Sequence, residues 1–364
     1  MNGLKPKVFV MMSGGVDSSV AAFLLREQGT YDVIGAFIKG YNMDGCQDRE
    51  AEDARRVAEH LGIPFYVIDL EEEYKQFVVE YLVNGYRNGI TPNPDVMCNK
   101  EIKFGVFLQK ALALGADYVA TGHYARSATY NLQPITDNKK QETTYSLQKG
   151  IDGNKDQSYF LWTLTQEQLR HCLFPIGAYE KPKIREIAAA AGLPTAQKKD
   201  SQGICFLGKI SLREFLEQYL PKRKGDIVTV DGVKVGEHEG VWFYTIGQRH
   251  GLHVGGGPAY FVVKKDVASN VITVSHDDHL LEQACADIGL VELNFMGMCA
   301  IAPPKSIPVM VRIRYRQPLF AATLVADGEA YRLQFDEPQR FVAVGQSAVF
   351  YDADGVVIGG GVMR

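Results

Sequence analysis

Over the first two hundred residues, short apolar runs alternate with stretches in which apolar residues recur at helical spacing. The apolar runs predict strands at 8–12, 32–38, 65–70 and 117–121. The helical spacing predicts helices at 51–61, 102–112, 184–191 and 212–220. This alternation is typical of an α/β fold in which helices cover both faces of a doubly wound parallel sheet.

The pattern changes near Gly225, where short alternating strands divided by Asp-Gly and Gly-rich turns begin. We expect an α/β domain over 1–210, a small β-rich domain over 211–283 and a second one over 284–364. The segment 309–316 alternates strictly, so its arginines at 312, 314 and 316 share one face of a predicted strand. That face suits a phosphate backbone, or it is an ordinary solvated strand face.

Charge and cysteine usage limit the class of protein. The chain has 39 Lys and Arg against 43 Asp and Glu, so a nucleic-acid partner would have to meet local basic patches. One such patch is predicted at 181–225, which has ten basic residues and four acidic ones. No apolar run approaches the length of a membrane span. Six cysteines without a CxxC pair indicate reduced thiols in the cytoplasm.

The segment Ser13-Gly14-Gly15 directly follows the first predicted strand, and Asp17 and Ser18 begin the next helix. Glycines, hydroxyls and the free N–H groups of a helix start together favour a bound phosphate. The loop lacks the lysine of a Walker-type phosphate loop. Asp17 would oppose phosphate unless Mg²⁺ lay between them. The alternative is a tight turn with a Ser or Asp N-cap, which needs no ligand.

Two cysteines stand in basic surroundings. Cys98 precedes a predicted helix with Lys100 and Lys103 nearby, and Cys205 lies in a lysine-rich loop that contains glycine. Such surroundings predict a lowered thiol pKa. Asp95 is close enough in sequence to accept or donate a proton. The remaining cysteines are expected to be inert, as lone cysteines usually are: Cys46, Cys172, Cys285 and Cys299.

The string SGGVDSS matches the pyrophosphate-loop ATP pyrophosphatases. After it, in order, NPDVMCNKEIKFG, ATGHYAR, KDQSYFL, DSQGICFLG, IGQRHGL and GQSAVFY resemble the bacterial tRNA-specific 2-thiouridylases over essentially the whole chain. The resemblance implies an N-terminal domain like the adenine nucleotide α-hydrolases and a C-terminal β-barrel that contacts tRNA.

The same resemblance implies an activity. ATP would adenylate O2 of the wobble uridine in the tRNAs for lysine, glutamate and glutamine, and a cysteine persulfide would then supply sulfur. It also implies Mg²⁺, binding of the tRNA anticodon stem-loop, a sulfur-donor protein and a cytoplasmic monomer.

Residue roles follow from the matching positions. Those implied to bind ATP are Met11, Met12, Ser13, Gly14, Gly15, Val16, Asp17, Ser18, Ile38 and Gly122. Asn93, Pro94 and Asp95 would hold the target base. Cys98 would be the nucleophile and Cys205 the persulfide carrier, with Asp95 as proton donor or acceptor. The implied tRNA contacts are His123, Lys155, Asp156, Gln157, Arg314, Tyr315 and Gln346. The segment 42–50 lacks an aromatic-acidic insertion of some relatives, so contacts there stay open.

Three alternatives remain open. A pyrophosphate-loop amidotransferase or synthetase acting on a small metabolite would give the two cysteines no task. A non-catalytic RNA-binding protein would keep only a relic nucleotide site. The third alternative concerns mechanism, because Asp95, Cys98 and Cys205 could ligate an iron–sulfur cluster.

Overall fold

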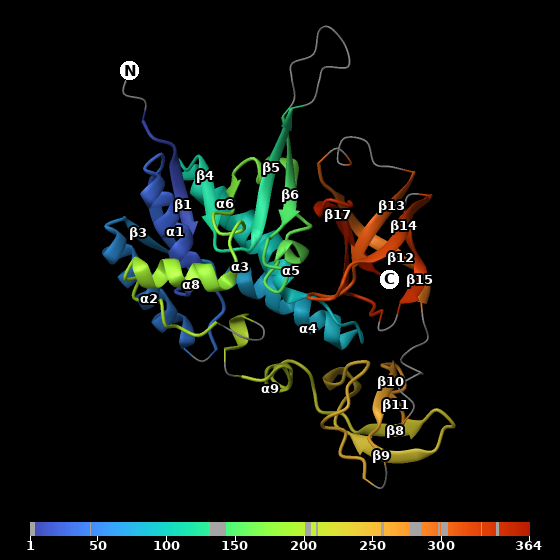
Figure 1. Ribbon diagram of the computed structural model, residues 1–364. Helices are drawn as coiled ribbons and strands as arrows, with labels where there is room; N and C mark the ends of the chain where they lie inside the picture. Colours follow the sequence, from blue (N-terminus) through green and yellow to red (C-terminus); the bar gives the residue numbers. More distant parts are fainter. Residues whose placement is uncertain are drawn as a thin grey trace.

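The computed structural model describes the following residues: 4–43, 45–131, 143–200, 205–208, 210–255, 258–276, 285–297, 299, 305–328, 330–339 and 342–364. Figure 1 shows an N-terminal α/β part, a C-terminal barrel beside it, and a small β-rich part carrying β8 to β11. Among the described residues, every helix is too short or too polar to cross a membrane.

The N-terminal part is built on a five-stranded parallel sheet. In spatial order its strands are β3 (Phe65–Asp69), β2 (Asp32–Lys39), β1 (Lys7–Met11), β4 (Tyr118–Thr121) and β7 (Cys172–Leu173). The first four agree with the predicted strands to within a residue or two. The central strands β1, β2 and β4 are mostly apolar because helices cover them on both faces, whereas the edge strand β3 leaves Tyr66 and Val67 about half exposed.

The two faces of the sheet have separate cores, which confirms the doubly wound arrangement. Val8 and Val10 of β1 pack with helices α1 (Val16–Gln28), α2 (Cys46–Leu61) and α8 (Lys181–Ala190). The alternate β1 residues face the second set of helices. This set comprises α3 (Glu71–Tyr74), η1 (Lys75–Val79), α4 (Glu80–Arg87), α5 (Pro94–Met97), η2 (Cys98–Phe107) and α6 (Leu108–Ala113).

The C-terminal part is a closed six-stranded barrel, as the resemblance implies. Its strands follow the order β12 (Cys285–Phe295), β15 (Ala330–Gln339), β14 (Phe320–Asp327), β13 (Ser306–Arg312), β16 (Ser347–Tyr351) and β17 (Val356–Met363). Pairing of β12 with β17 closes it. A hairpin of β5 (Ala125–Asn131) and β6 (Thr143–Lys149) pairs with β17, and Figure 1 shows it between the α/β part and the barrel.

The central part is a small four-stranded sheet. Its strands follow the order β10 (Phe261–Asp266), β11 (Val271–Ser275), β8 (Gly225–Thr229) and β9 (Lys234–His238). The remaining short elements are η3 (Ser158–Phe160), α7 (Gln166–Leu169), η4 (Cys205–Leu207), α9 (Leu212–Leu216) and η5 (Val241–Phe243).

The predicted strand over 309–316 is corrected by the structure. Strand β13 ends at Arg312, whose guanidinium is buried and lies 2.9 Å from the Asp156 carboxylate. Arg312 therefore does not belong to a solvated arginine face, because a buried arginine needs a counter-charge inside the protein. Past the strand, Arg314 is half-buried and Arg316 is exposed with a positive φ.

Candidate active site

The glycine loop after β1 has the geometry of an anion site. Gly14 has a φ of +71°, and a Cβ there would lie 2.3 Å from the backbone oxygen of Glu50. Gly15 is the N-cap of α1, and among the described residues no side chain caps that helix. The Ser18 and Ser19 hydroxyls donate to the Gly15 carbonyl instead. The alternative of a Ser or Asp N-cap is therefore wrong, and within the described ranges no side chain accepts from the first N–H groups of α1.

Gly122, at the carboxyl end of β4, lies directly against the start of α1. A Cβ on it would approach the Ser18 backbone nitrogen to 2.6 Å and the Asp17 carbonyl carbon to 2.8 Å. In a parallel sheet, ligands bind in the crevice beyond the carboxyl ends of the strands. The loop residues 11–18 and Gly122, all expected to bind ATP, therefore share one edge of the sheet; Ile38 lies near the end of neighbouring β2.

Two lysines from a distant part of the chain reach the loop. The Lys181 ammonium lies 2.8 Å from a carboxylate oxygen of Asp17 and 2.8 Å from one of Asp200. The Lys198 ammonium donates to the Gly14 carbonyl at 3.0 Å and to Asp53 at 2.7 Å. Sequence reasoning assigned this basic segment to the surroundings of Cys205 and missed its contact with the loop. The two lysines supply the positive charge that the loop sequence lacks.

Asp17 and Asp200 are the acidic partners in this cluster. The Tyr124 hydroxyl donates to Asp17 at 2.7 Å, and burial followed by the Asp17 charge raises the Tyr124 pKa, so the hydroxyl keeps its proton. Burial alone would raise the pKa of Asp200, but hydrogen bonds from Lys155 and Lys181 lower it to about 2. Asp200 is therefore ionised at neutral pH, and it holds the segment that leads toward Cys205 against the loop.

Cys98 lies on the opposite face of the sheet from α1. Asn93 caps the preceding helix α5 by accepting from the Val96 backbone, so the helix start lies one turn before the cysteine. The Cys98 side chain is buried, and burial raises its pKa despite the opposing effects of Lys103 and a hydrogen bond with Tyr74. The expected lowering of this pKa is therefore wrong. The local sequence shows the lysines but not the loss of water around the sulfur.

Three predicted site residues gather around Lys103. Burial raises the pKa of Asp95 and of Cys98, and the nearby Lys103 charge opposes both shifts. Burial, followed by Lys103, lowers the pKa of His123 well below its usual value. The His123 ring is fixed by a 2.8 Å hydrogen bond between its Nδ1 and the Thr121 hydroxyl. The cluster thus holds a neutral imidazole, a thiol and a carboxyl whose neutral form is favoured by burial.

The barrel holds the segment predicted to bind the target base. The Gln346 amide donates to the Thr91 carbonyl at 2.6 Å, and Tyr159, which donates to the Ser347 carbonyl, is also hydrogen-bonded to Asn93. The Tyr315 ring packs on Phe160 with centroids 4.5 Å apart.

Other predicted tRNA contacts already have protein partners. Lys155 pairs with Asp200 at 2.6 Å, Gln157 accepts from the Tyr124 backbone at 3.0 Å, and Asp156 is buried against Arg312. Burial lowers the pKa of Arg314. Their contacts with tRNA stay predictions.

Cys205 begins η4, and its side chain, like that of Cys46 and like residues 201–204, lies outside the described part. Cys172 is buried and donates to the Gln168 carbonyl, in keeping with an inert thiol. Within the described ranges no group of three or more His, Cys, Asp or Glu side chains could hold a metal ion. The iron–sulfur alternative includes Cys205 and stays open.

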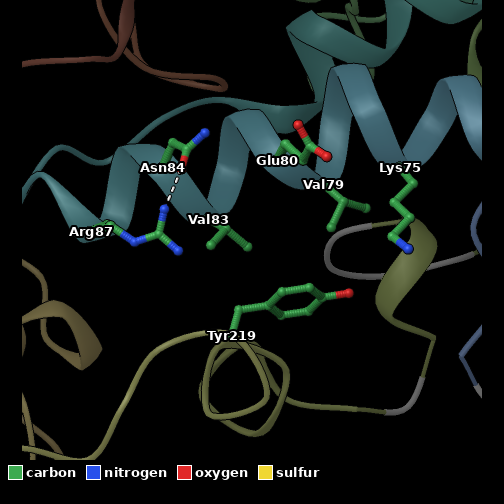
Figure 2. Close-up of a pocket in the computed structure, with 7 residues that line it drawn as sticks. All are labelled: Lys75, Val79, Glu80, Val83, Asn84, Arg87 and Tyr219. Carbon is green, nitrogen blue, oxygen red and sulfur yellow. Dashed lines mark hydrogen bonds between the residues drawn. The ribbon is translucent and has the colours of Figure 1, made fainter.

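A groove of about 340 Å³ lies away from this chemistry, between the helices η1–α4 and the chain after α9 (Figure 2). Figure 2 shows Tyr219 facing the helices from the opposite wall. The groove contains none of the residues predicted to bind ATP or the target base; its lining is Lys75, Val79, Glu80, Val83, Asn84, Arg87 and Tyr219.

Three family profiles cover most of the chain. They are described as "tRNA methyl transferase HUP domain" (residues 6–209), "tRNA methyl transferase PRC-barrel domain" (213–276) and "Aminomethyltransferase beta-barrel domain" (290–363).

Relatives that align over nearly the whole chain carry a different name from these family profiles. The tRNA-specific 2-thiouridylase MnmA of Alkaliphilus oremlandii is 46% identical and aligns over 98% of this chain and 96% of its own. That of Streptococcus mutans is 45% identical over 99% and 95%. Among solved structures, the U34-tRNA thiolase NcsA of Methanococcus maripaludis with its 4Fe–4S cluster is 16% identical, covers 59% of this chain and 64% of its own, and has a TM-score of 0.37.

Proposed function

The chain belongs to the tRNA-specific 2-thiouridylase family, and we propose that it uses ATP to replace O2 of the wobble uridine of tRNA by sulfur. The observation that carries this proposal is the junction at Gly122 and His123. Gly122 packs on the start of the phosphate loop helix, and the next residue belongs to the cluster that contains Cys98 and Asp95. The proposal thus brings nucleotide binding and thiol chemistry to one edge of the sheet.

The loop would hold the pyrophosphate part of ATP. The uncapped N–H groups of α1, together with Lys181 and Lys198, favour a polyanion there. Asp17 fits Mg²⁺ because this ion is usually held by one or two carboxylates plus substrate phosphates. When bound, Mg²⁺ would neutralise part of the pyrophosphate charge. Lys181 must then share its contact with Asp17 between the carboxylate and the phosphates.

Adenylation explains why a uridine oxygen could leave. O2 attacks the α-phosphate of ATP, pyrophosphate departs, and the oxygen becomes part of AMP, a far better leaving group. The outer sulfur of a Cys205 persulfide then bonds to C2 and AMP is released. Cys98 attacks the inner sulfur, a Cys98–Cys205 disulfide forms, and the base keeps the outer sulfur. An external thiol must reduce the disulfide before the next turnover.

Asp95 is suited to the proton transfer that this scheme needs. Cys98 must lose its proton before it attacks, and its raised pKa means that a neighbouring group should receive that proton. Asp95 lies one helical turn before Cys98, and burial keeps its pKa above the usual value, closer to neutral pH. We propose Asp95 as this acceptor and as a donor to the departing AMP.

The test is direct. The protein is incubated with ATP, Mg²⁺, a persulfide sulfur source and unmodified tRNA, and the digested tRNA is analysed by mass spectrometry. We expect 2-thiouridine at the wobble position and tRNA-dependent pyrophosphate release. Cys98→Ser and Cys205→Ser should abolish 2-thiouridine, whereas Cys172→Ser, a matched buried thiol outside the site, should not.

Other products would overturn the proposal in distinguishable ways. A methylated nucleoside would favour the activity named in the family profiles. Unchanged turnover in both cysteine variants would favour a small-metabolite synthetase. Binding of tRNA without pyrophosphate release would favour a non-catalytic RNA-binding protein.

A further inference from the structure

Tyr74 lies between the two elements that carry Cys98 and Cys205, and none of the roles assigned above uses it. It is the last residue of α3, and its side chain is only 6% exposed. Its hydroxyl is hydrogen-bonded to the Cys98 thiol, and this bond acts to lower the thiol pKa. The Tyr74 hydroxyl therefore donates to the sulfur and favours the thiolate, against the effect of burial.

The ring of the same tyrosine packs on the turn that begins with Cys205. Phe206, the next residue, is 3% exposed and meets the Tyr74 ring edge to face, with centroids 5.6 Å apart. Phe206 also packs on Phe215 at 5.4 Å and on Tyr41 at 6.3 Å. The hydroxyl of Tyr41 in turn meets that of Tyr219 at 2.7 Å, and Tyr219 forms one wall of the groove in Figure 2. These five residues are called the aromatic cluster below.

A third contact fixes the ring of Tyr74 at the end of β2. A Cβ added to Gly40 would lie 2.8 Å from a ring carbon of Tyr74, so only glycine leaves room for the ring. Gly40 directly follows β2, the strand whose Ile38 is predicted to touch adenine. Three independent contacts therefore define the position of one side chain.

We propose that Tyr74 is a positioning residue for sulfur transfer: its hydroxyl orients the Cys98 sulfur, and its ring fixes the Cys205 turn beside it. The inference rests on the proposed function, because it gives the two cysteines a joint task. Sulfur transfer requires the Cys98 sulfur to approach the Cys205 sulfur in a fixed orientation. A single rigid side chain that contacts both elements fixes their position relative to each other.

The test uses thiol chemistry and needs neither tRNA nor ATP. The first measurement is the rate at which iodoacetamide alkylates Cys98 at pH 8, read by peptide mass spectrometry. The second is the rate at which diamide, a two-electron oxidant, converts the Cys98 and Cys205 thiols to a disulfide. Dividing the rate of disulfide formation by the rate of alkylation cancels the reactivity of the Cys98 thiol. The ratio therefore reports on how Cys205 is placed relative to Cys98.

Three variants separate the two roles. Tyr74→Phe keeps the ring, so we expect alkylation to slow by roughly tenfold while the ratio stays unchanged, since a hydrogen bond to a charged group is lost. Tyr74→Leu should lower the ratio as well, by about tenfold or more. Gly40→Ala should lower the ratio with Tyr74 itself intact. Tyr86→Phe, which removes another buried hydroxyl from the neighbouring helix α4, is the matched control and should leave both rates unchanged.

Each outcome decides part of the proposal. Equal alkylation rates in Tyr74→Phe and Tyr86→Phe would overturn the role of the hydroxyl. A wild-type ratio in Tyr74→Leu, or in Gly40→Ala if the leucine variant does not fold, would overturn the role of the ring. If wild-type protein shows these thiol properties but makes no 2-thiouridine, the proposed function fails while the placement of the thiols by Tyr74 stands.

Discussion

Removing the charge of Asp156 should loosen the barrel from the N-terminal part. The carboxylate is fully buried and pairs at 2.9 Å with Arg312, whose side chain is 6% exposed. Asp156 also accepts hydrogen bonds from the backbone N–H groups of Gly150 and Ser158. Arg312 belongs to β13 of the barrel, whereas Asp156 lies in the segment before η3. The pair therefore joins two parts of the chain inside a buried interface.

The size of the effect follows from the burial of both partners. Asp156→Asn leaves an amide oxygen for the two backbone donors but leaves the Arg312 charge without a counter-charge. Leaving one buried charge unpaired costs about 3–5 kcal/mol. In the part of the chain that the structure describes, the Nε atom of Arg312 is already buried without a hydrogen-bond partner. The double variant with Arg312→Met removes both charges and should recover more than about 1 kcal/mol relative to Asp156→Asn alone.

The reporter for this experiment is built into the interface. Trp162 donates from its indole nitrogen to the Ser347 hydroxyl of the barrel at 3.0 Å, and the second tryptophan, Trp242, lies in the central part. In a Trp242→Phe background, urea unfolding followed by fluorescence reports on the interface alone. Asp287→Asn, which breaks an exposed pair with Arg332 on the same barrel, is the control and should shift the transition little. Coincident transitions for Asp156→Asn and its parent would refute this reasoning.

Three further predictions concern the site. Gly122→Ala should weaken ATP binding by about tenfold or more, because its Cβ would push the start of α1 out of place; unchanged affinity by calorimetry would contradict the packing argument. Asp200 has a folded pKa of about 2, below its ordinary 3.8, so it stabilises the fold above about pH 4 and loses that effect as the pH falls toward 2. The stability gap between wild type and Asp200→Asn, measured by urea titration, should therefore close over that window. Gln346→Leu removes the hydrogen bond that holds the Thr91 segment, so it should raise the KM for tRNA severalfold and leave the affinity for ATP unchanged. Equal effects on both substrates would argue against this prediction.

The N-terminal sheet could be predicted because its signals are local. Each central strand is a continuous apolar run, and Gly62 and Gly115 mark the ends of helical patterns with positive φ. The end of β13 could not be predicted in this way. Alternation alone extends the strand through Arg316, whereas the strand ends where Arg312 turns inward to a carboxylate 156 residues away in sequence.

The site was only partly predictable, for the same reason. The glycine loop and Cys98 stand out from sequence, but the pKa of that thiol depends on burial, which its neighbours in sequence do not report. Tyr74 carries no local signal at all, since its contacts with Cys98 and Phe206 come from distant segments.

The positions of Lys181 and Lys198 offer a physical reason why the phosphate loop itself contains no lysine. Lys181 and Lys198 bring positive charge to the loop from the segment that continues toward Cys205, and Asp200 anchors that segment by pairing with Lys181. A lysine inside the loop would neutralise phosphate equally well, but it would leave the cysteine turn unconnected to the nucleotide. Lys181 begins α8 and Lys198 follows it, so the part of the chain that completes the phosphate site also leads into η4, whose Phe206 packs on Tyr74 within the aromatic cluster. Loss of the Lys181–Asp200 contact should therefore weaken nucleotide binding and also misplace the cysteine turn. If the positive charge came instead from a lysine within the loop, its loss would affect only nucleotide binding.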